Sequence, residues 1–386
     1  MTTKTINSLS LCALAVASVI SAPGFAASLD STQVSYGGYI KLDAIWSDFS
    51  NGTLGAQNIG RDFYVPSTTP VGASSNEDAV FDMHARQSRF NFGTKTALDD
   101  GSSIDTKIEL DFIASTGGNE RVTNSYSPRI RQAYVTYKGW LFGQAWSNFQ
   151  NVGALPETLD FIGPAEGTVF VRQAMVKYTT GNWSFSMENP ESTITVNKAM
   201  VVTDDASMPD FTARYTHKAD WGDFVVTALA RQLTYKAGAA DESESSFGIS
   251  ASGTVKMGKD NLKFMLTQGS GLGRYIGVNA THGAVYDGNS LDAIDSTSGF
   301  IAYQHHWNDT LRSTFLYSFF KADNNTDLLA FSGDPTKSIS SYSANLLYSP
   351  VKKLTFGVEY KVATRETESG ADGDLDRLQL SAKYVF

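Results

Sequence analysis

The chain has 386 residues, a formal net charge of −9, 12% aromatic residues and 33 glycines. An acidic chain is not expected to bind nucleic acid, because phosphate contacts require a basic surface. No apolar run approaches the ~18 residues that a membrane-spanning helix requires. A closed β-barrel is still able to cross a membrane, because only every second residue of its strands meets the lipid.

Residues 1–26 have the features of a secretory signal peptide. Lys4 precedes an apolar run over 9–20, and small residues surround the predicted cleavage site after Ala26. The alternative interpretation of this apolar run is that it forms a buried helix of a cytosolic protein. Cleavage leaves residues 27–386 as one domain, and it removes Cys12, so the mature chain has no thiol for a disulfide or a metal.

The end of the chain alternates strictly between apolar and polar side chains. One face carries Leu378, Leu380, Ala382, Tyr384 and Phe386, and the other carries Arg377, Gln379, Ser381 and Lys383. Successive side chains of a strand point to opposite faces, so this segment predicts a membrane strand with one lipid face and one wet face. Its terminal phenylalanine resembles the insertion signal of bacterial outer-membrane barrels.

The same alternation predicts sixteen strands along the mature chain. They cover residues 36–47, 84–95, 104–113, 130–138, 140–146, 172–179, 182–188, 210–217, 223–233, 246–257, 261–268, 299–307, 310–319, 341–349, 354–362 and 375–386. In 84–95, Arg86 and Arg89 are three residues apart, so both can point inward only if a bulge interrupts the strand.

Short and long connections alternate between these strands without exception. Seven are short: 97–103, 139, 180–181, 218–222, 258–260, 308–309 and 350–353. Eight are long: 48–83, 114–129, 147–171, 189–209, 234–245, 269–298, 320–340 and 363–374. Outer-membrane barrels have short periplasmic turns, long extracellular loops and an even number of strands. The predicted fold is therefore an all-β, antiparallel transmembrane barrel of sixteen strands in the outer membrane of a Gram-negative bacterium.

Tryptophans support this arrangement, because amphipathic rings collect at the two membrane interfaces. Four lie within a few residues of short turns and two lie at the opposite ends of strands: Trp140, Trp183, Trp221 and Trp307, then Trp46 and Trp146. The alternative, chance placement in the core of a soluble β-sandwich, is disfavoured because sandwich strands are shorter and their loops alternate less regularly.

Two groups of residues are candidates for controlling passage through such a barrel. Strand parity directs eight cations inward: Arg89, Lys107, Lys177, Arg214, Arg231, Arg312, Lys361 and Arg377. The third long loop, 147–171, is rich in turns and moderately apolar, which predicts that it folds into the lumen. Its acids Glu157, Asp160 and Glu166 are expected to face wall arginines across a constriction. Any single inward cation is more often just in contact with the water of the lumen, or paired with a neighbouring carboxylate, than involved in selectivity.

Motifs for other kinds of chemistry are weak. No Ser/His/Asp grouping, phosphate loop or zinc signature is present, so neither an enzyme nor a cofactor is expected. His305 and His306 are adjacent and point to opposite faces of a strand. The Asp372, Asp374 and Asp376 series resembles a fragment of a calcium loop but lacks its closing glutamate.

Several short motifs, in this order, resemble the DcaP-type porins of Gram-negative outer membranes. They are Arg86-Gln-Ser-Arg89-Phe, Arg131-Gln-Ala-Tyr134-Val, Gly143-Gln144, Met187-Glu188-Asn189-Pro190, Gly271-Leu-Gly-Arg274-Tyr275, Leu346-Leu-Tyr-Ser-Pro350, Gly357-Val-Glu359-Tyr360, Arg365-Glu366 and Lys383-Tyr384-Val-Phe386. The resemblance implies a homotrimer of sixteen-stranded barrels that takes up small anionic solutes such as dicarboxylates. It also implies that Arg89, Arg131, Arg172 and Glu188 line the pore.

The leading hypothesis is therefore a porin for passive diffusion with a preference for anionic organic acids. Arginine supports this preference because it grips carboxylates bidentately, which lysine cannot do. Within the same fold, a general or sugar-selective pore with weak ion selectivity remains open. An adhesin or an outer-membrane enzyme built on a barrel is the alternative from another class. The expected partners are the small anionic solutes, the lipid of the outer membrane and further copies of the chain.

Overall fold

The structure is a computed structural model that describes residues 31–72, 78–115, 117–119 and 122–386. The predicted signal peptide, 1–26, lies outside the described residues. Within them, no helix has both the length and the apolar character needed to cross a membrane. Nearly all regular structure is β, and the only α-helix described is the single turn α2, Leu329–Ser332.

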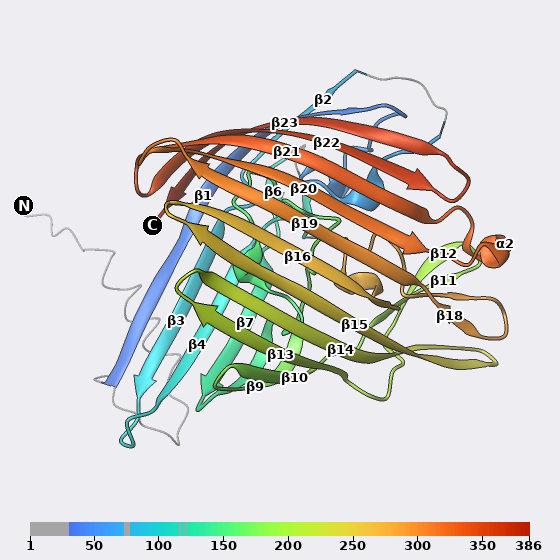
Figure 1. The fold of residues 1–386 in the computed structure, drawn as a ribbon, viewed down its shortest axis with the longest axis horizontal. Helices are drawn as coiled ribbons and strands as arrows, with labels where there is room; N and C mark the ends of the chain where they lie inside the picture. Colours follow the sequence, from blue (N-terminus) through green and yellow to red (C-terminus); the bar gives the residue numbers. More distant parts are fainter. Residues whose placement is uncertain (1–30, 73–77, 116, 120–121) are drawn as a thin grey trace, which may run out of the picture.

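One closed, antiparallel β-barrel of sixteen strands forms the body of the protein, as predicted (Figure 1). Two consecutive segments, β2 and β3, together make one barrel strand. The barrel is built from β1 Thr32–Phe49, β2 Val80–His84, β3 Arg89–Ala97, β4 Ser103–Asp111, β7 Arg129–Tyr137, β8 Trp140–Trp146, β9 Arg172–Thr180, β10 Trp183–Glu188, β13 Asp210–Ala219, β14 Gly222–Ala237, β15 Ala240–Met257, β16 Asp260–Ser270, β19 Asp295–His306, β20 Leu311–Asp323, β21 Thr336–Val351, β22 Leu354–Thr367 and β23 Asp372–Val385.

The first and last strands close the sheet. Strand β1 pairs with β23 from Tyr39↔Val385 to Phe49↔Leu375, and its other edge pairs with β3 and then with β2. The break between β2 and β3 covers 85–88, where sequence reasoning required a bulge around Arg86. This interruption allows Arg86 to leave the inward row and bind the Asp62 carboxylate at 2.6 Å.

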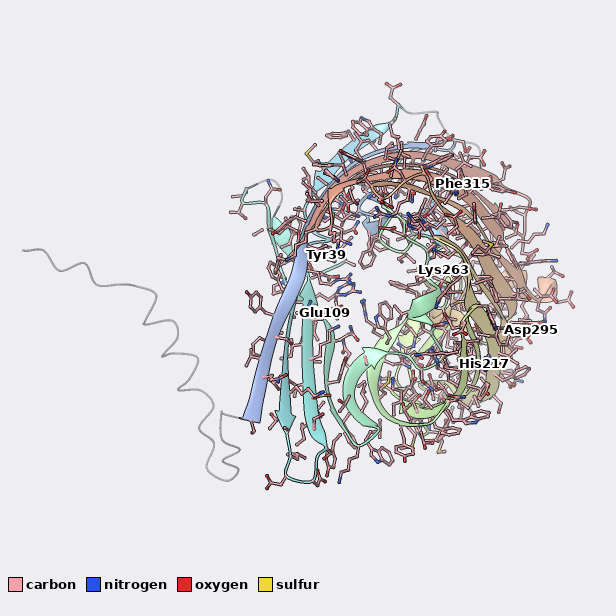
Figure 2. All side chains as sticks on the ribbon, turned by 60° about the vertical axis from the view of Figure 1, so that its left-hand side comes forward. Tyr39, Glu109, His217, Lys263, Asp295 and Phe315 are labelled. Atoms are coloured by element: carbon pink, nitrogen blue, oxygen red, sulfur yellow. The ribbon has the colours of Figure 1, made fainter. Side chains whose placement is uncertain are left out.

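Side chains alternate between the two faces of the wall as the sequence predicted (Figure 2). Large apolar residues of the outward rows are exposed, for example Phe356, Tyr360 and Leu380 at 44%, 50% and 41%. Polar neighbours such as Glu359 and Gln379 are buried on the inner side, and Figure 2 shows Glu109 and Lys263 toward the interior. An apolar band on the outside and polar groups inside are what a barrel in lipid requires.

All seven short connections are turns between adjacent strands, and several contain a glycine with positive φ. Gly139 between β7 and β8 has φ 85°, and Gly258 between β15 and β16 has φ 68°. Side chains with a Cβ rarely adopt this conformation, so glycine makes the tight reversals possible.

Two of the eight predicted long loops are instead extensions of strands, which corrects the prediction. Strands β14 and β15 stay paired up to Ala237↔Ala240, so 234–245 is mostly hairpin. Strands β22 and β23 pair up to Glu366↔Asp372, so most of 363–374 is also strand. The polar composition of these tips is also typical of loops, but their side-chain alternation continues the strand pattern above the membrane.

The remaining loops pack over the extracellular half of the barrel. The loops after β10 and β16 form a four-stranded sheet from β11 Ser192–Val196, β12 Ala199–Thr203, β17 Ala284–Tyr286 and β18 Leu291–Ala293. The loop after β4 contains the small hairpin β5 Gly118–Asn119 and β6 Ser125–Tyr126. Short 3₁₀ turns complete the loops: η2 Ile59–Arg61, η3 Pro66–Thr68, η4 Val152–Ala154, η5 Gly273–Tyr275 and η6 Thr326–Leu328.

A new charge is expected to cost much more stability on the outer face of the wall than on the inner face. Leu266 on β16 faces outward near the middle of the strand, and Leu266→Lys is expected to lower the free energy of unfolding by about 2–4 kcal/mol because it places an ammonium in hydrocarbon. Thr136→Lys on the inner face of β7, opposite Asp105, is the matched control and should cost much less. Urea titration in lipid measures both values, and equal losses would contradict the assigned faces.

Candidate pore constriction

The third long loop, 147–171, runs along the inner wall and is bound there by polar side chains of the strands. At its start, Asn148 Nδ2 donates to Thr212 Oγ1 at 2.9 Å, and Arg214 Nη1 donates to the Gln150 carbonyl at 2.8 Å. Asn151 Nδ2 donates to Ser252 Oγ at 3.0 Å. A loop without regular structure needs such partners for its backbone and polar groups, and the inward rows of the barrel supply them.

The middle of the loop is fixed to the far wall, at β1, β22 and β23. The Glu359 carboxylate accepts hydrogen bonds from the backbone N–H of Leu159 at 2.7 Å and of Asp160 at 3.0 Å. The Leu159 carbonyl accepts from Lys41 Nζ at 2.5 Å and from Gln379 Nε2 at 3.1 Å. Both the N–H and the C=O of Leu159 are therefore bound to strand side chains, and these bonds determine the distance of the loop from the wall.

Two of the three predicted loop acids lie beneath the loop. The Asp160 carboxylate accepts from the backbone N–H of Tyr64, Ile162 and Gly163 at 2.8–3.1 Å, and its side chain is buried. Glu166 is fully buried and is bonded to the Ser341 hydroxyl. The structure therefore differs from the expectation of acids facing arginines across a gap, because Asp160 binds backbone N–H groups of the first and third loops and Glu166 binds a hydroxyl of β21.

The third acid, Glu157, forms an ion pair directly with the wall. Its carboxylate accepts from Arg312 Nη2 at 2.5 Å and Nε at 2.7 Å, and from Gln304 Nε2 at 2.7 Å. Burial alone raises the pKa of Glu157, but the hydrogen bonds and charge of Arg312 outweigh it and hold the pKa below its usual value. This bidentate pair fixes the loop to β20.

A compact group of charges lies on β3, β4 and β7. Glu109 contacts Arg131 at 2.7 Å, Lys107 at 3.2 Å and Arg89 at 3.8 Å. Asp111 contacts Arg131 at 2.7 Å and binds Arg129 through two parallel hydrogen bonds of 2.9 and 3.0 Å. Four cations therefore share two carboxylates, and the group carries an excess of positive charge.

Several further inward cations have no carboxylate within 4 Å among the described residues. Half-buried examples come from β9, β13, β16 and β23: Lys177, Arg214, Lys263 and Lys383. Arg365 on β22 is another, and its guanidinium donates to the carbonyls of Ser67 and Thr69. Lys263 Nζ donates to the Leu155 carbonyl at 2.8 Å, and Lys383 Nζ lies 4.4 Å from the ring centre of Tyr39. Lys263 and Lys383 were missing from the predicted site although strand parity turns both inward, so the signal was present in the sequence.

The guanidinium of Arg172 is in contact with two aromatic rings. It begins β9 opposite Trp146, and its guanidinium lies 4.6 Å from the Trp146 ring centre and 5.9 Å from that of Phe170. The rings of Trp146 and Phe170 meet edge to face at 5.0 Å. Trp146, which the sequence places in an aromatic girdle, also packs against Phe170 of the third loop. Cation–π contacts hold a guanidinium in place while they leave its N–H groups available to an anion.

Five residues predicted to line the pore are buried instead: Arg131, Glu188, Arg231, Lys361 and Arg377. Lys361 Nζ donates to the Gly163 carbonyl at 2.7 Å, and Arg377 Nη2 to the Gly60 carbonyl at 2.6 Å. The loops that pack against the wall cover these side chains. Sequence parity identifies the inner face correctly but contains no information on which inward residues a loop covers.

Across the described ranges, no group of three or more His, Cys, Asp and Glu side chains is arranged to hold an ion. Asp374 and Asp376 instead accept hydrogen bonds from hydroxyls of the neighbouring strand β22, those of Thr364 and Tyr360.

Comparison with known proteins identifies the family. The model of the DcaP outer membrane protein family matches residues 12–386. The chain belongs to the DcaP outer membrane protein family. It is accordingly a channel of the Gram-negative outer membrane and not an enzyme. A search among curated proteins finds no match.

Solved structures agree with this assignment. The outer membrane channel DcaP of Acinetobacter baumannii is 27% identical, with a TM-score of 0.79 over 93% of this chain and 99% of that chain. An anion-selective porin from Comamonas acidovorans is 9% identical, with a TM-score of 0.57 over 92% and 100%. The trimer form of OmpT from Vibrio cholerae is 12% identical, with a TM-score of 0.52 over 92% and 100%. The last two likenesses show the fold alone.

Removal of the Glu359 carboxylate tests whether its hydrogen bonds to Leu159 and Asp160 fix the third loop to the wall. Glu359→Ala leaves two buried N–H groups without an acceptor, so the free energy of unfolding should fall by about 1–3 kcal/mol per unpaired group. The current through a single open channel should become noisier. Glu359→Gln keeps one acceptor oxygen and should lie between wild type and Glu359→Ala. Wild-type noise in Glu359→Ala would show that this contact does not hold the loop.

The pair between Glu157 and Arg312 predicts a response to acid. A carboxylate whose pKa is lowered on folding contributes stability above its ordinary pKa of about 4.3, and this contribution is lost as the pH falls through the lower folded value. Conductance should therefore be steady from pH 7 to about 4.3 and change below it. Glu157→Gln, which lacks the titrating group, should show the acid-form conductance already at pH 7. An identical acid response in this variant would contradict the role of the pair.

Proposed function

We propose that the channel passes small hydrophilic solutes by passive diffusion and prefers anionic organic acids of the dicarboxylate type. The observation that carries the proposal is the surplus of cations on the inner wall. Lys177, Arg214, Lys263 and Lys383 lack a carboxylate partner among the described residues. An aqueous lumen with a positive potential concentrates anions and lowers the barrier to their passage.

The placement of the cations supports solutes with more than one carboxylate. Lys263 and Arg312 stand beside the loop at Leu155 and Glu157, whereas Lys107 and Lys177 come from strands β4 and β9 of another part of the wall. A solute with a carboxylate at each end is able to meet two such cations in succession. Binding to several weak sites allows entry without trapping, which conduction requires.

Inward carboxylates limit the selectivity to a preference. Asp105 and Asp223 are half-buried, and neither forms an ion pair with a described residue. A general or sugar-selective pore with weak ion selectivity is the second candidate, because these acids partly offset the cations. The homotrimer forms part of the same proposal and is supported by the trimeric porin fold of the Vibrio OmpT structure.

Bilayer recordings in a salt gradient test the selectivity. The double variant Lys177→Ala/Arg214→Ala should shift the reversal potential toward cation selectivity, because it removes two half-buried inward charges that have no carboxylate partner among the described residues. Lys321→Ala, an exposed lysine on the outward face of β20, is the matched control and should leave the reversal potential unchanged. Conductance steps should occur in groups of three if the barrel is a trimer.

Two outcomes would contradict the proposal. An unchanged reversal potential in Lys177→Ala/Arg214→Ala would remove the wall cations from the selectivity. In liposome swelling, equal rates for succinate and for a neutral sugar of similar size would favour the general pore over the anion-preferring one.

A further inference from the structure

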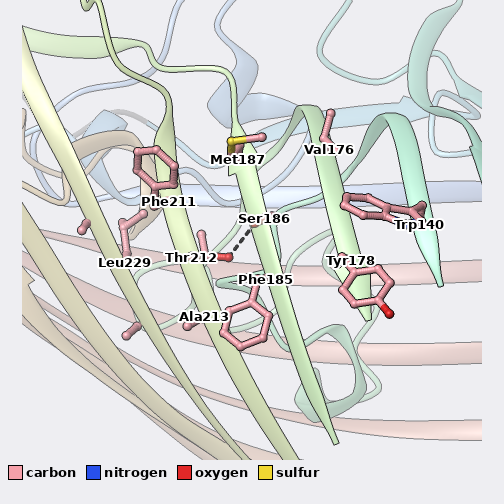
Figure 3. A pocket seen from close by; sticks show the side chains of 12 residues that line it. Trp140, Val176, Tyr178, Phe185, Ser186, Met187, Phe211, Thr212, Ala213 and Leu229 are labelled. Atoms are coloured by element: carbon pink, nitrogen blue, oxygen red, sulfur yellow. Dashed lines mark hydrogen bonds between the residues drawn. The ribbon is translucent and has the colours of Figure 1, made fainter. Parts of the chain in front are cut away.

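The outward wall of the barrel contains an apolar hollow over strands β8 to β10, β13 and β14 (Figure 3). Its volume is about 500 Å³, and the side chains around it are almost entirely hydrocarbon and aromatic. Figure 3 shows Phe185, Phe211, Trp140 and Tyr178 around a floor of small side chains. The inward cations Lys177 on β9 and Arg214 on β13 belong to the opposite, inner side of the same strands.

The register of the strands explains why the wall is hollow here. In one outward row Phe185 is paired with Ala213, Ala213 with Ala228, and Ala228 with Ile249. Two consecutive alanines thus stand between two large side chains. The exposed fractions of Phe185 and Ile249 are 47% and 56%, so both project from the wall while the alanine methyl groups do not.

The next row continues the hollow along the strand direction. Phe211 is paired with Ala230, and Ala230 with Phe247, which is 65% exposed. The alanine trough is therefore a strip floored by Ala213, Ala228 and Ala230. It lies between a ridge of Phe185 and Phe211 and a ridge of Phe247 and Ile249.

The hollow reaches the periplasmic membrane interface on the side of Phe185 that faces away from the alanines. Trp140 and Tyr178 line it there: their ring centres are 4.7 Å apart, and Tyr178 is paired with Phe185. Both lie beside the short turns after β7 and β9, where an aromatic girdle meets the lipid headgroups. The hollow therefore extends from the headgroup region of the periplasmic leaflet, past Phe185, to the alanine trough, and it is continuous with the lipid-facing band of the barrel.

We propose that the alanine trough holds one acyl chain of a phospholipid from the periplasmic leaflet. A hydrocarbon chain in the trough touches the methyl floor and both ridges at once. If no chain entered, the floor would face a void and lose these dispersion contacts. The trough contains no charged side chain that a headgroup or a peptide would need. The chain is thus held at a defined site, whereas lipids around a flat wall exchange freely.

Filling the trough tests this site. Ala228→Phe/Ala230→Phe places two rings on the floor, and Leu378→Phe/Leu380→Phe adds similar bulk to the outward face of β23, away from the trough. Each protein is transferred to detergent micelles that contain dipalmitoyl phosphatidylglycerol, and native mass spectrometry counts the lipids retained per barrel. Wild type and the β23 control should retain one more lipid than Ala228→Phe/Ala230→Phe. Ala228→Leu is a milder second variant if the double variant fails to migrate as a folded barrel.

Three results would overturn the proposal. One is the same lipid count in wild type and in the trough variants. Another is retention of hexa-acylated lipid A in preference to the phospholipid, which would place the occupant in the other leaflet. The third is loss of subunit association with an unchanged lipid count, which would show that a second copy of the chain covers the trough.

Discussion

Lipid imposes the constraint from which the rest of this structure follows: no backbone N–H or C=O inside the hydrocarbon layer is able to bond to water. Each barrel strand therefore pairs on both edges, and the sheet has to close, as it does between β1 and β23. Closure makes one face of every strand meet lipid and the other meet the lumen. The strict alternation of the sequence is the direct result of this constraint.

The same backbone requirement governs the third loop. Apart from the short 3₁₀ turn η4, it enters the barrel without regular structure, so inward side chains have to provide its hydrogen-bond partners. Glu359 receives two backbone N–H groups, while Lys41 and Lys361 each donate to a loop carbonyl. Some charged residues of the inner wall are buried and hold the loop, others remain half-buried along the lumen, and Arg214 and Lys263 do both. The second group, which includes Lys177, carries the proposed selectivity.

The barrel was predictable from sequence because its signal is local. Alternation in 354–362 or 375–386 is set by the two faces of a single strand, and it required no knowledge of distant contacts. Closure, the sixteen strands and the seven short turns followed from it. The extracellular ends of the strands were less predictable. Strands β14 and β15 continue as a hairpin beyond the membrane, and the residues of this hairpin are as polar as those of a loop.

The candidate site was only partly predictable because it depends on contacts across the barrel. Parity placed Arg214 and Arg377 on the same inner face, yet Arg377 is buried beneath the first loop and Arg214 is half-buried beside the third. Their difference arises from residues more than 60 positions away in the sequence. Lys263 shows the converse case, since the alternation of side chains along 261–268 turns it inward as clearly as Arg214, and local sequence is sufficient to place it.

Cysteine labelling tests most directly the claim that alternate residues face lipid and a positively charged lumen. The predicted mature chain has no cysteine, so Thr355→Cys on the inner face of β22, where the side chain is half-buried, and Phe356→Cys on its outer face each introduce a single thiol. In membranes, the inner thiol should react with water-soluble thiosulfonates, faster with the anionic reagent than with the cationic one, while the outer thiol stays unmodified. Faster reaction at residue 356, or faster reaction of the cationic reagent at residue 355, would contradict this account.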